Sequence, residues 1–165
     1  MAGNFSFDVV SDFDRQELVN ALDQVKREIS QRYDLKGTDT FLELEKDKIF
    51  IITNSELTLN SVIDIIRQKA VKRKLSLKIF EYNNIEVISG NKVKQTITLK
   101  KGLNQEIAKK ISKNIRDEFK KVNVSINGET LRVTSKSKND LQLTIKLLDN
   151  LEETYKIPLQ ANNYR

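Results

Sequence analysis

The sequence predicts an α+β protein in which one pattern of elements occurs twice. The first copy reads strand, helix, hairpin, helix and a further strand between residues 4 and 88, and the second repeats this order from Val93 onward. Ile107 lies 89 positions after Leu18, and Leu141 lies 82 positions after Leu59, so the apolar stripes of the copies run in step. This is the split pattern of ferredoxin-like domains, in which two helices cover one face of an antiparallel sheet.

The first copy is predicted from alternating and helical spacing. Residues 4–10 alternate as a half-buried strand, and Ser11 is placed to cap the helix that follows. Strands at 41–45 and 48–53 are joined by a tight turn at Lys46-Asp47. Residues 49–52 are apolar on both faces, which predicts a central strand covered on both sides. Ser55 can cap a second helix, which ends in the basic cluster 69–74.

The second copy is preceded by short strands at 77–80 and 85–88 and by a turn at Gly90-Asn91. A strand at 93–99 and a helix at 104–119 come next. Strands at 122–126 and 130–134 flank Asn127-Gly128, a strong hairpin signal. Ser137 with Asp140 resembles a capping box before the last helix, and residues 159–164 are the last predicted strand.

Composition favours a soluble, cytoplasmic protein. No apolar run approaches the roughly 20 residues that span a bilayer, and residues 1–13 lack the basic start and apolar centre of a signal peptide. The chain has no Cys and no His, so the common nucleophilic, acid–base and zinc arrangements are missing. Asp8, Asp12 and Asp14 are conceivable metal ligands, but helix capping explains the last two more simply. We expect no enzyme, no cofactor and no metal.

Basic charge is concentrated in the second half of the sequence. Residues 84–165 carry 16 Lys and Arg against 9 Asp and Glu, whereas residues 1–83 carry 13 against 14. Such asymmetry indicates a surface for phosphate-bearing partners, although many proteins carry a basic face without binding nucleic acid.

Two basic segments on the second copy are candidates for phosphate binding. Lys100, Lys101 and Gly102 precede a helix start, where free N–H groups attract anions; the alternative is an ordinary strand-to-helix turn. The same helix carries one basic stripe, which either follows a phosphate backbone or is a merely solvated face. The stripe consists of Lys109, Lys113, Arg116 and Lys120.

The outer face of the second predicted sheet is polar and has no aromatic residue. Base stacking is therefore not expected there. We expect this face to contact phosphate or sugar groups; the alternative is that it is buried against another domain or a partner. This face comprises Lys94, Thr96, Thr98, Lys100, Asn123, Ser125, Arg132 and Thr134. The full predicted set of nucleotide- or phosphate-binding residues is Lys94, Lys100, Lys101, Gly102, Lys109, Lys113, Arg116, Arg132, Lys136 and Lys138.

Several stretches, in order along the whole chain, resemble the YajQ family of bacterial nucleotide-binding proteins. They are residues 6–11 (SFDVVS), 32–37 (RYDLKG), 108–111 (AKKI), 136–142 (KSKNDLQ), 158–160 (PLQ) and 163–165 (NYR). Leu35 and Tyr164 stand where the family usually has Phe, a mild departure.

The resemblance implies two ferredoxin-like domains that exchange their C-terminal strands. The first domain would be residues 1–76 plus 155–165, and the second residues 77–154. The resemblance also implies a nucleotide or RNA as ligand, with cyclic diguanylate and a protein partner as the alternative. The absence of a long apolar run predicts no membrane association. Together with the charge asymmetry, it predicts a non-enzymatic binding protein that uses a basic surface on the second domain.

Overall fold

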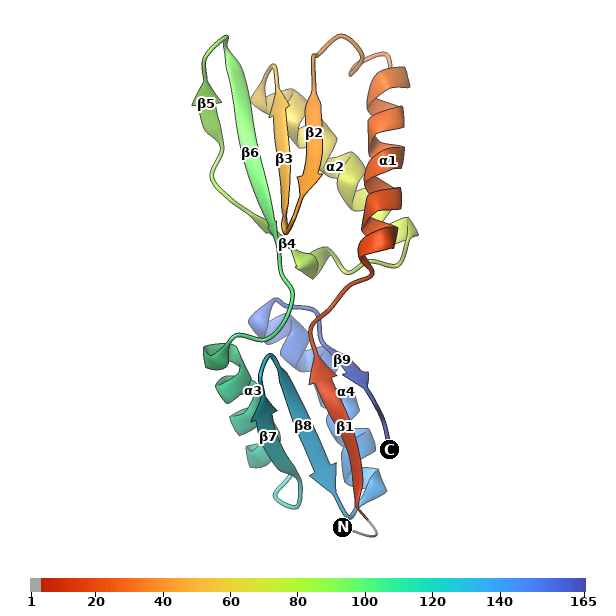
Figure 1. Ribbon diagram of the computed structural model, residues 1–165, viewed down its shortest axis with the longest axis vertical. Coiled ribbons are helices and arrows are strands. Elements are labelled where there is room, and N and C mark those ends of the chain that lie inside the picture. The colour runs from red at the N-terminus through yellow and green to blue at the C-terminus, as the bar shows by residue number, and fades with distance from the viewer. Residues whose placement is uncertain (1–3) are drawn as a thin grey trace. The chain divides into compact units, whose positions relative to one another are not determined.

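The computed structural model describes residues 4–165, which form two compact units (Figure 1). We call residues 4–12 with Lys101–Arg165 the terminal unit and Phe13–Lys100 the central unit. Each unit has its own cluster of buried apolar side chains. Among the described residues, no helix is both long and apolar enough to cross a membrane.

The terminal unit is an antiparallel sheet with two helices. Its elements are β1 (Phe5–Val10), α3 (Gln105–Glu118), β7 (Asn123–Asn127), β8 (Thr130–Ser135), α4 (Lys138–Tyr155) and β9 (Gln160–Asn162). The strand order is β7-β8-β1-β9. Alternation along β1 buries Phe7 and Val9 in the core that α3 and α4 share with the sheet.

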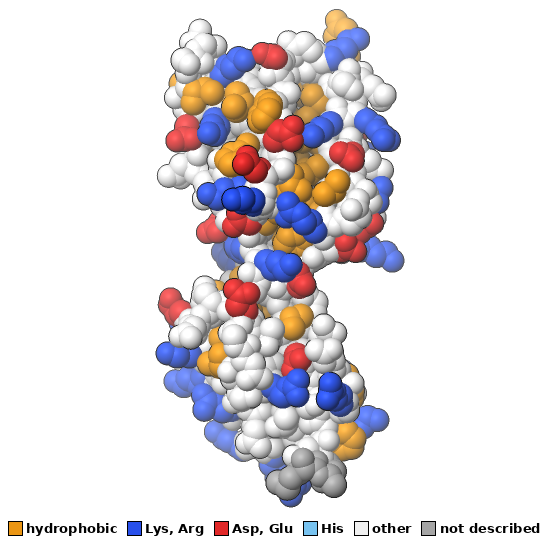
Figure 2. All heavy atoms as spheres, in the orientation of Figure 1, with side chains coloured by type: hydrophobic (Ala, Val, Ile, Leu, Met, Phe, Trp, Pro, Cys, Tyr) orange, Lys and Arg blue, Asp and Glu red, His pale blue; other side chains and the backbone are white. Residues whose placement is uncertain are grey.

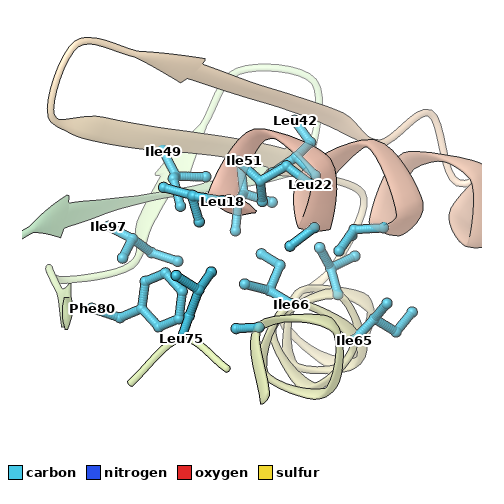
Figure 3. Close-up of a cluster of buried hydrophobic side chains, with 14 of the residues drawn as sticks. Leu18, Leu22, Leu42, Ile49, Ile51, Ile65, Ile66, Leu75, Phe80 and Ile97 are labelled. Atoms are coloured by element: carbon cyan, nitrogen blue, oxygen red, sulfur yellow. The ribbon is translucent and has the colours of Figure 1, made fainter. Parts of the chain in front are cut away.

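The central unit has the same architecture. Its elements are α1 (Arg15–Gln31), β2 (Phe41–Glu45), β3 (Lys48–Thr53), α2 (Glu56–Lys72), the 3₁₀ helix η1 (Leu77–Ile79), β4 (Phe80–Tyr82), β5 (Glu86–Ile88) and β6 (Lys92–Leu99). The strand order is β2-β3-β6-β4, and β5 also pairs with β6. Figure 3 shows Ile49, Ile51 and Ile97 of the sheet directed toward Leu18 and Ile66 of the helices.

The strand exchange differs from the predicted one. The first strand of each copy lies in the sheet of the other copy. β1 pairs with β8 and β9 of the second copy, and β6 pairs with β3 and β4 of the first copy. The predicted exchange of C-terminal strands is not seen, and the units have other boundaries than 1–76 plus 155–165 and 77–154. The short turn at Gly90-Asn91 explains the position of β6, since it returns the chain directly from β5 into the same sheet. Both sheets retain the strand order of a ferredoxin-like domain.

The helix caps agree with the sequence at two predicted positions and differ at one. The side chains of Ser55 and Ser137 accept from the backbone N–H groups of Thr58 and Asp140, as predicted. The cap of α1 is Asp14 instead of Ser11, whose side chain is buried. The predicted strand at 77–80 is mostly η1, with β4 beginning at its end.

The exchange also removes the charge asymmetry of the sequence halves. Residues 1–12 with 101–165 carry 13 Lys and Arg against 10 Asp and Glu, and residues 13–100 carry 16 against 13. The two units therefore have equal net charge. A basic surface can therefore arise only from the way the cations are distributed within each unit.

Candidate functional site

The predicted site residues lie in both units. Lys94 is in β6, and Lys100 follows that strand, so both belong to the central unit. The other eight belong to the terminal unit. The predicted polar sheet face is likewise divided, with 94–100 in one sheet and 123–134 in the other.

Acidic side chains surround the predicted anion site at the start of α3. Gly102 has a φ of +81°, and an added Cβ would lie 2.7 Å from Glu129 Oε2, so the carboxylate packs against this glycine. Lys101 Nζ lies 3.5 Å from Asp12 Oδ1. The side chain of Asn104 accepts from the N–H of Ile107 and caps the helix. These acidic groups and the cap disfavour an anion at the start of α3.

Arg132 is held in an ion pair on the sheet of the terminal unit. Its Nε donates to Asp8 Oδ1 at 3.1 Å, and its Nη2 donates to Asp8 Oδ2 at 3.4 Å. Asn163 Nδ2 donates to the same Oδ2 at 2.9 Å. The guanidinium therefore neutralises a buried carboxylate of its own unit.

The basic stripe is exposed along α3. The opposite side of this helix is buried and consists of Ala108, Ile111, Ser112 and Ile115. Lys109 and Lys113 are exposed and have no ion-pair partner within residues 4–165, whereas Arg116 Nε donates to Ser112 O at 3.3 Å. Figure 2 shows Lys and Arg side chains gathered over the α3 side of the terminal unit. Lys120 extends the stripe beyond Glu118, where the helix ends.

A polar pocket lies where β7 begins and β8 ends, beside the start of α4. Its volume is about 510 Å³, within the range of about 300–1,000 Å³ typical of small-molecule sites. The lining residues are Asn4, Lys121, Asn123, Thr134, Ser135, Lys136 and Ser137. We call this cavity the α4 pocket. The ammonium groups of Lys121 and Lys136 have no ion-pair partner among the described residues.

Ser135 fixes the two basic segments of the α4 pocket relative to each other. Its hydroxyl donates to Lys121 O at 3.2 Å and accepts from the N–H of Ser137 at 3.1 Å. The next N–H groups, of Lys138 and Asn139, begin an 18-residue helix and have no acceptor within it. Two lysines and the positive end of a helix dipole therefore converge here, partly offset by Asp140 in the first turn.

Lys136 and Lys138 are among the site residues predicted from the sequence, whereas Lys121, Ser135 and Ser137 are not. The hairpin signal at Asn127-Gly128 was the available clue. A hairpin that closes at those residues brings the segment before β7 beside the segment after β8, and Asn123 does pair with Thr134.

The sheet face that carries Lys94 does contain aromatic rings, contrary to the expectation of a face without them. Thr96 pairs with Phe50 in register, and Lys94 Nζ lies 5.5 Å from the centre of the Phe50 ring. Phe41 on the neighbouring strand is 48% exposed. The exchange of first strands produces this neighbourhood, because it places β6 beside β3. β3 is a central strand, as predicted, but the predicted cover on both faces is not seen. Ile49 and Ile51 on the helix side are buried, whereas Phe50 and Ile52 on the other face are half-buried.

The described residues contain no cluster of three or more His, Cys, Asp or Glu side chains suited to a metal ion.

Comparison with known proteins gives one family over nearly the whole chain. The family described as "Nucleotide-binding protein YajQ-like" matches residues 5–165. Two proteins named as nucleotide-binding proteins, from Prochlorococcus marinus strains MED4 and MIT 9515, are each 90% identical over 165 residues, which is 100% of both chains compared. A nucleotide-binding protein of strain MIT 9211 is 59% identical, again over 100% of both chains. The chain therefore belongs to the YajQ-like family.

Proposed function

We propose that this protein binds nucleotides without converting them, and that the α4 pocket of the terminal unit holds their phosphate groups. One observation carries the choice of site: Lys121 and Lys136, both without an ion-pair partner in the described chain, line a polar pocket at a helix start. The names of the relatives support the ligand class.

In this proposal the phosphate oxygens accept from the two lysines and from the first N–H groups of α4. The side chains of Asn123 and Ser137 then contact the sugar. None of the described residues that line the pocket carries an aromatic ring, so none of them is suited to stacking a base. We therefore expect adenine and guanine nucleotides to bind with similar affinity.

The test is a fluorescence titration with a nucleotide that carries a fluorophore on its ribose. Lys121→Gln and Lys136→Gln should each weaken binding about tenfold, equivalent to about 1.4 kcal/mol, because each removes one charge from the phosphate site. Lys109→Gln is the matched control, since it removes the same charge from the same unit outside the pocket. Binding that depends on Lys109 but not on the pocket lysines would reject the pocket.

RNA is the second candidate ligand, and the α3 stripe favours it. Lys109 and Lys113 lie one helical turn apart on one exposed side, a spacing suited to successive phosphates of a strand. The double variant Lys109→Glu with Lys113→Glu should then lower RNA affinity and reduce its dependence on salt. Each lost phosphate contact changes the slope of log affinity against log salt by about 0.7 for single strands. An unchanged slope would show that the stripe on α3 does not contact RNA phosphates.

Cyclic diguanylate, with its two phosphates, is the alternative ligand, and it rests on the family resemblance. In that case the protein is a receptor that passes the signal to a protein partner in the cytoplasm. Isothermal calorimetry should show saturable binding of cyclic diguanylate that weakens in Lys136→Gln. If no heat of binding is measured at high protein concentration, cyclic diguanylate is not a ligand of this protein.

A further inference from the structure

The outer strand of the central sheet has an open hydrogen-bonding edge. Among the described residues β2 pairs only with β3, and it lies at the end of the strand order β2-β3-β6-β4 beside α1 (Figure 1). A strand in this position has a row of backbone N–H and C=O groups without strand partners.

The register identifies these groups. The N–H of Leu99 in β6 donates to the carbonyl of Asp47 at 2.7 Å, so the odd-numbered residues along β3 direct their backbone groups toward β6. The even-numbered ones then bond to β2. Leu42 and Leu44 pair with the odd-numbered Ile51 and Ile49, so their own N–H and C=O groups point to the open edge.

A groove follows this edge between β2 and α1. It consists of two hollows of about 550 Å³ and 250 Å³, and Lys26 and Glu43 line both. Lys26 Nζ lies 3.7 Å from Glu43 Oε2, with both side chains about half exposed. The apolar lining comes from Val19, Leu22, Ile29, Leu35, Phe41, Leu42 and Leu44. Figure 3 shows Leu22 and Leu42 close together at this side of the core.

The side chains of β2 define what an added strand would meet. Leu42 and Leu44 face the helices, whereas Glu43 and Glu45 are exposed and alternate to the other face. The Glu43 side chain reaches back to the rim of the groove, where it pairs with Lys26. A strand added to this edge has one face beside the apolar groove and the other beside the two carboxylates. Its residues should therefore alternate between apolar and basic.

The same carboxylates disfavour a second copy of this chain as the occupant. In a two-fold antiparallel pairing centred on Glu43, this residue would lie opposite its own equivalent, and like charges in that position are destabilising. A basic partner strand gains from the charges that oppose self-pairing.

We propose that β2 is a docking site for an extended segment of a partner protein, which adds as a further strand and places alternate basic residues opposite Glu43 and Glu45. Main-chain hydrogen bonds to Leu42 and Leu44 supply affinity, and the groove between α1 and β2 receives the apolar residues. The nucleotide site lies on the other unit, so this docking does not depend on the proposed function.

The experiment is a fluorescence-anisotropy titration of the full chain with a labelled nine-residue peptide of alternating Lys and Val. We expect saturable binding, and hydrogen exchange should slow at the amides of Leu42 and Leu44. Leu44→Pro removes one outward N–H without breaking a bond to β3, and it should weaken binding at least tenfold. Leu44→Val retains this N–H and should bind within twofold of the natural chain.

Peptide variants keep the test valid if Leu44→Pro does not fold. N-methylation of the peptide backbone at alternate positions on the pairing edge should abolish binding, whereas methylation at the intervening positions should not. Replacement of Lys by Glu in the peptide should weaken binding, and Glu43→Lys with Glu45→Lys should restore it. Binding unaffected by either methylation pattern, no binding, or concentration-dependent dimers that Leu44→Pro abolishes would each overturn the proposal.

Discussion

Asp8 connects two segments of the terminal unit that are distant in sequence. Its carboxylate accepts hydrogen bonds from Asn163 near the C-terminus and from Arg132 in β8. The hydrogen bond from Asn163 and the charge and hydrogen bond of Arg132 hold the pKa of Asp8 below its ordinary value of 3.8, although burial acts in the opposite direction. Arg132 is thus accounted for by the fold, without a ligand.

The lowered pKa gives stability a defined dependence on pH. The unfolded chain binds a proton at Asp8 more readily than the folded chain does. The contribution of Asp8 to stability is therefore fully present above pH 3.8 and is lost as the pH falls through the lower pKa of the folded state.

Asp8→Asn should reduce the free energy of unfolding at pH 7 by about 1 to 3 kcal/mol. Urea unfolding at pH 7 and pH 3 measures this, and the variant should lose less stability than the natural chain between them. Equal acid losses would show that Asp8 titrates normally.

At the scale of elements, hydrogen bonds at the helix starts are testable one by one. Ser55 Oγ accepts from the N–H of Thr58 at 3.1 Å at the start of α2. Ser55→Ala leaves that N–H without its acceptor, and it should lower the free energy of unfolding by about 1 kcal/mol. Ser61→Ala is the matched control in the same helix, since its hydroxyl donates only to Leu57 O and Ala has the higher helix propensity. Urea unfolding of both variants should show a loss for the first alone; equal losses would mean that the hydroxyl at Ser55 has no capping role.

Helices and hairpins were predictable because their signals are local. The apolar stripe of α3 and the Asn127-Gly128 turn each specify one element within a few residues. The cap of α1 was not predictable in the same way, because Ser11, Asp12 and Asp14 are all good capping residues. Ser11 does not cap α1 because of a contact distant in sequence. The carbonyl of a capping residue accepts the first hydrogen bond of its helix, whereas the carbonyl of Ser11 accepts from the N–H of Gly102 at 2.7 Å.

At the scale of the whole molecule, alternation did not identify which sheet each first strand joins. β1 and β6 both alternate, and either pattern fits the centre of either ferredoxin-like sheet. The predicted site depended on that choice, because the position of β6 determines which unit contains Lys94 and Lys100. From the sequence, the α4 pocket could be predicted only by working out the register of the β7–β8 hairpin. Composition carries no information about that register.

Deletion of residues 160–165 tests the observed strand pairing directly. β9 pairs with β1 at residues 8–10, and Arg165 and Ser6 exchange backbone hydrogen bonds of 2.8 and 3.1 Å. The deletion leaves β1 as an outer strand of the terminal sheet and removes Asn163 from Asp8. Hydrogen exchange read by mass spectrometry should show faster exchange in β1 and β8, with β2 and β3 unchanged. Removing Arg165 alone is the control, and it should affect only the residues around Ser6. Had the C-terminal strand completed the sheet of α1 and α2 instead, the loss of protection would fall on the central unit.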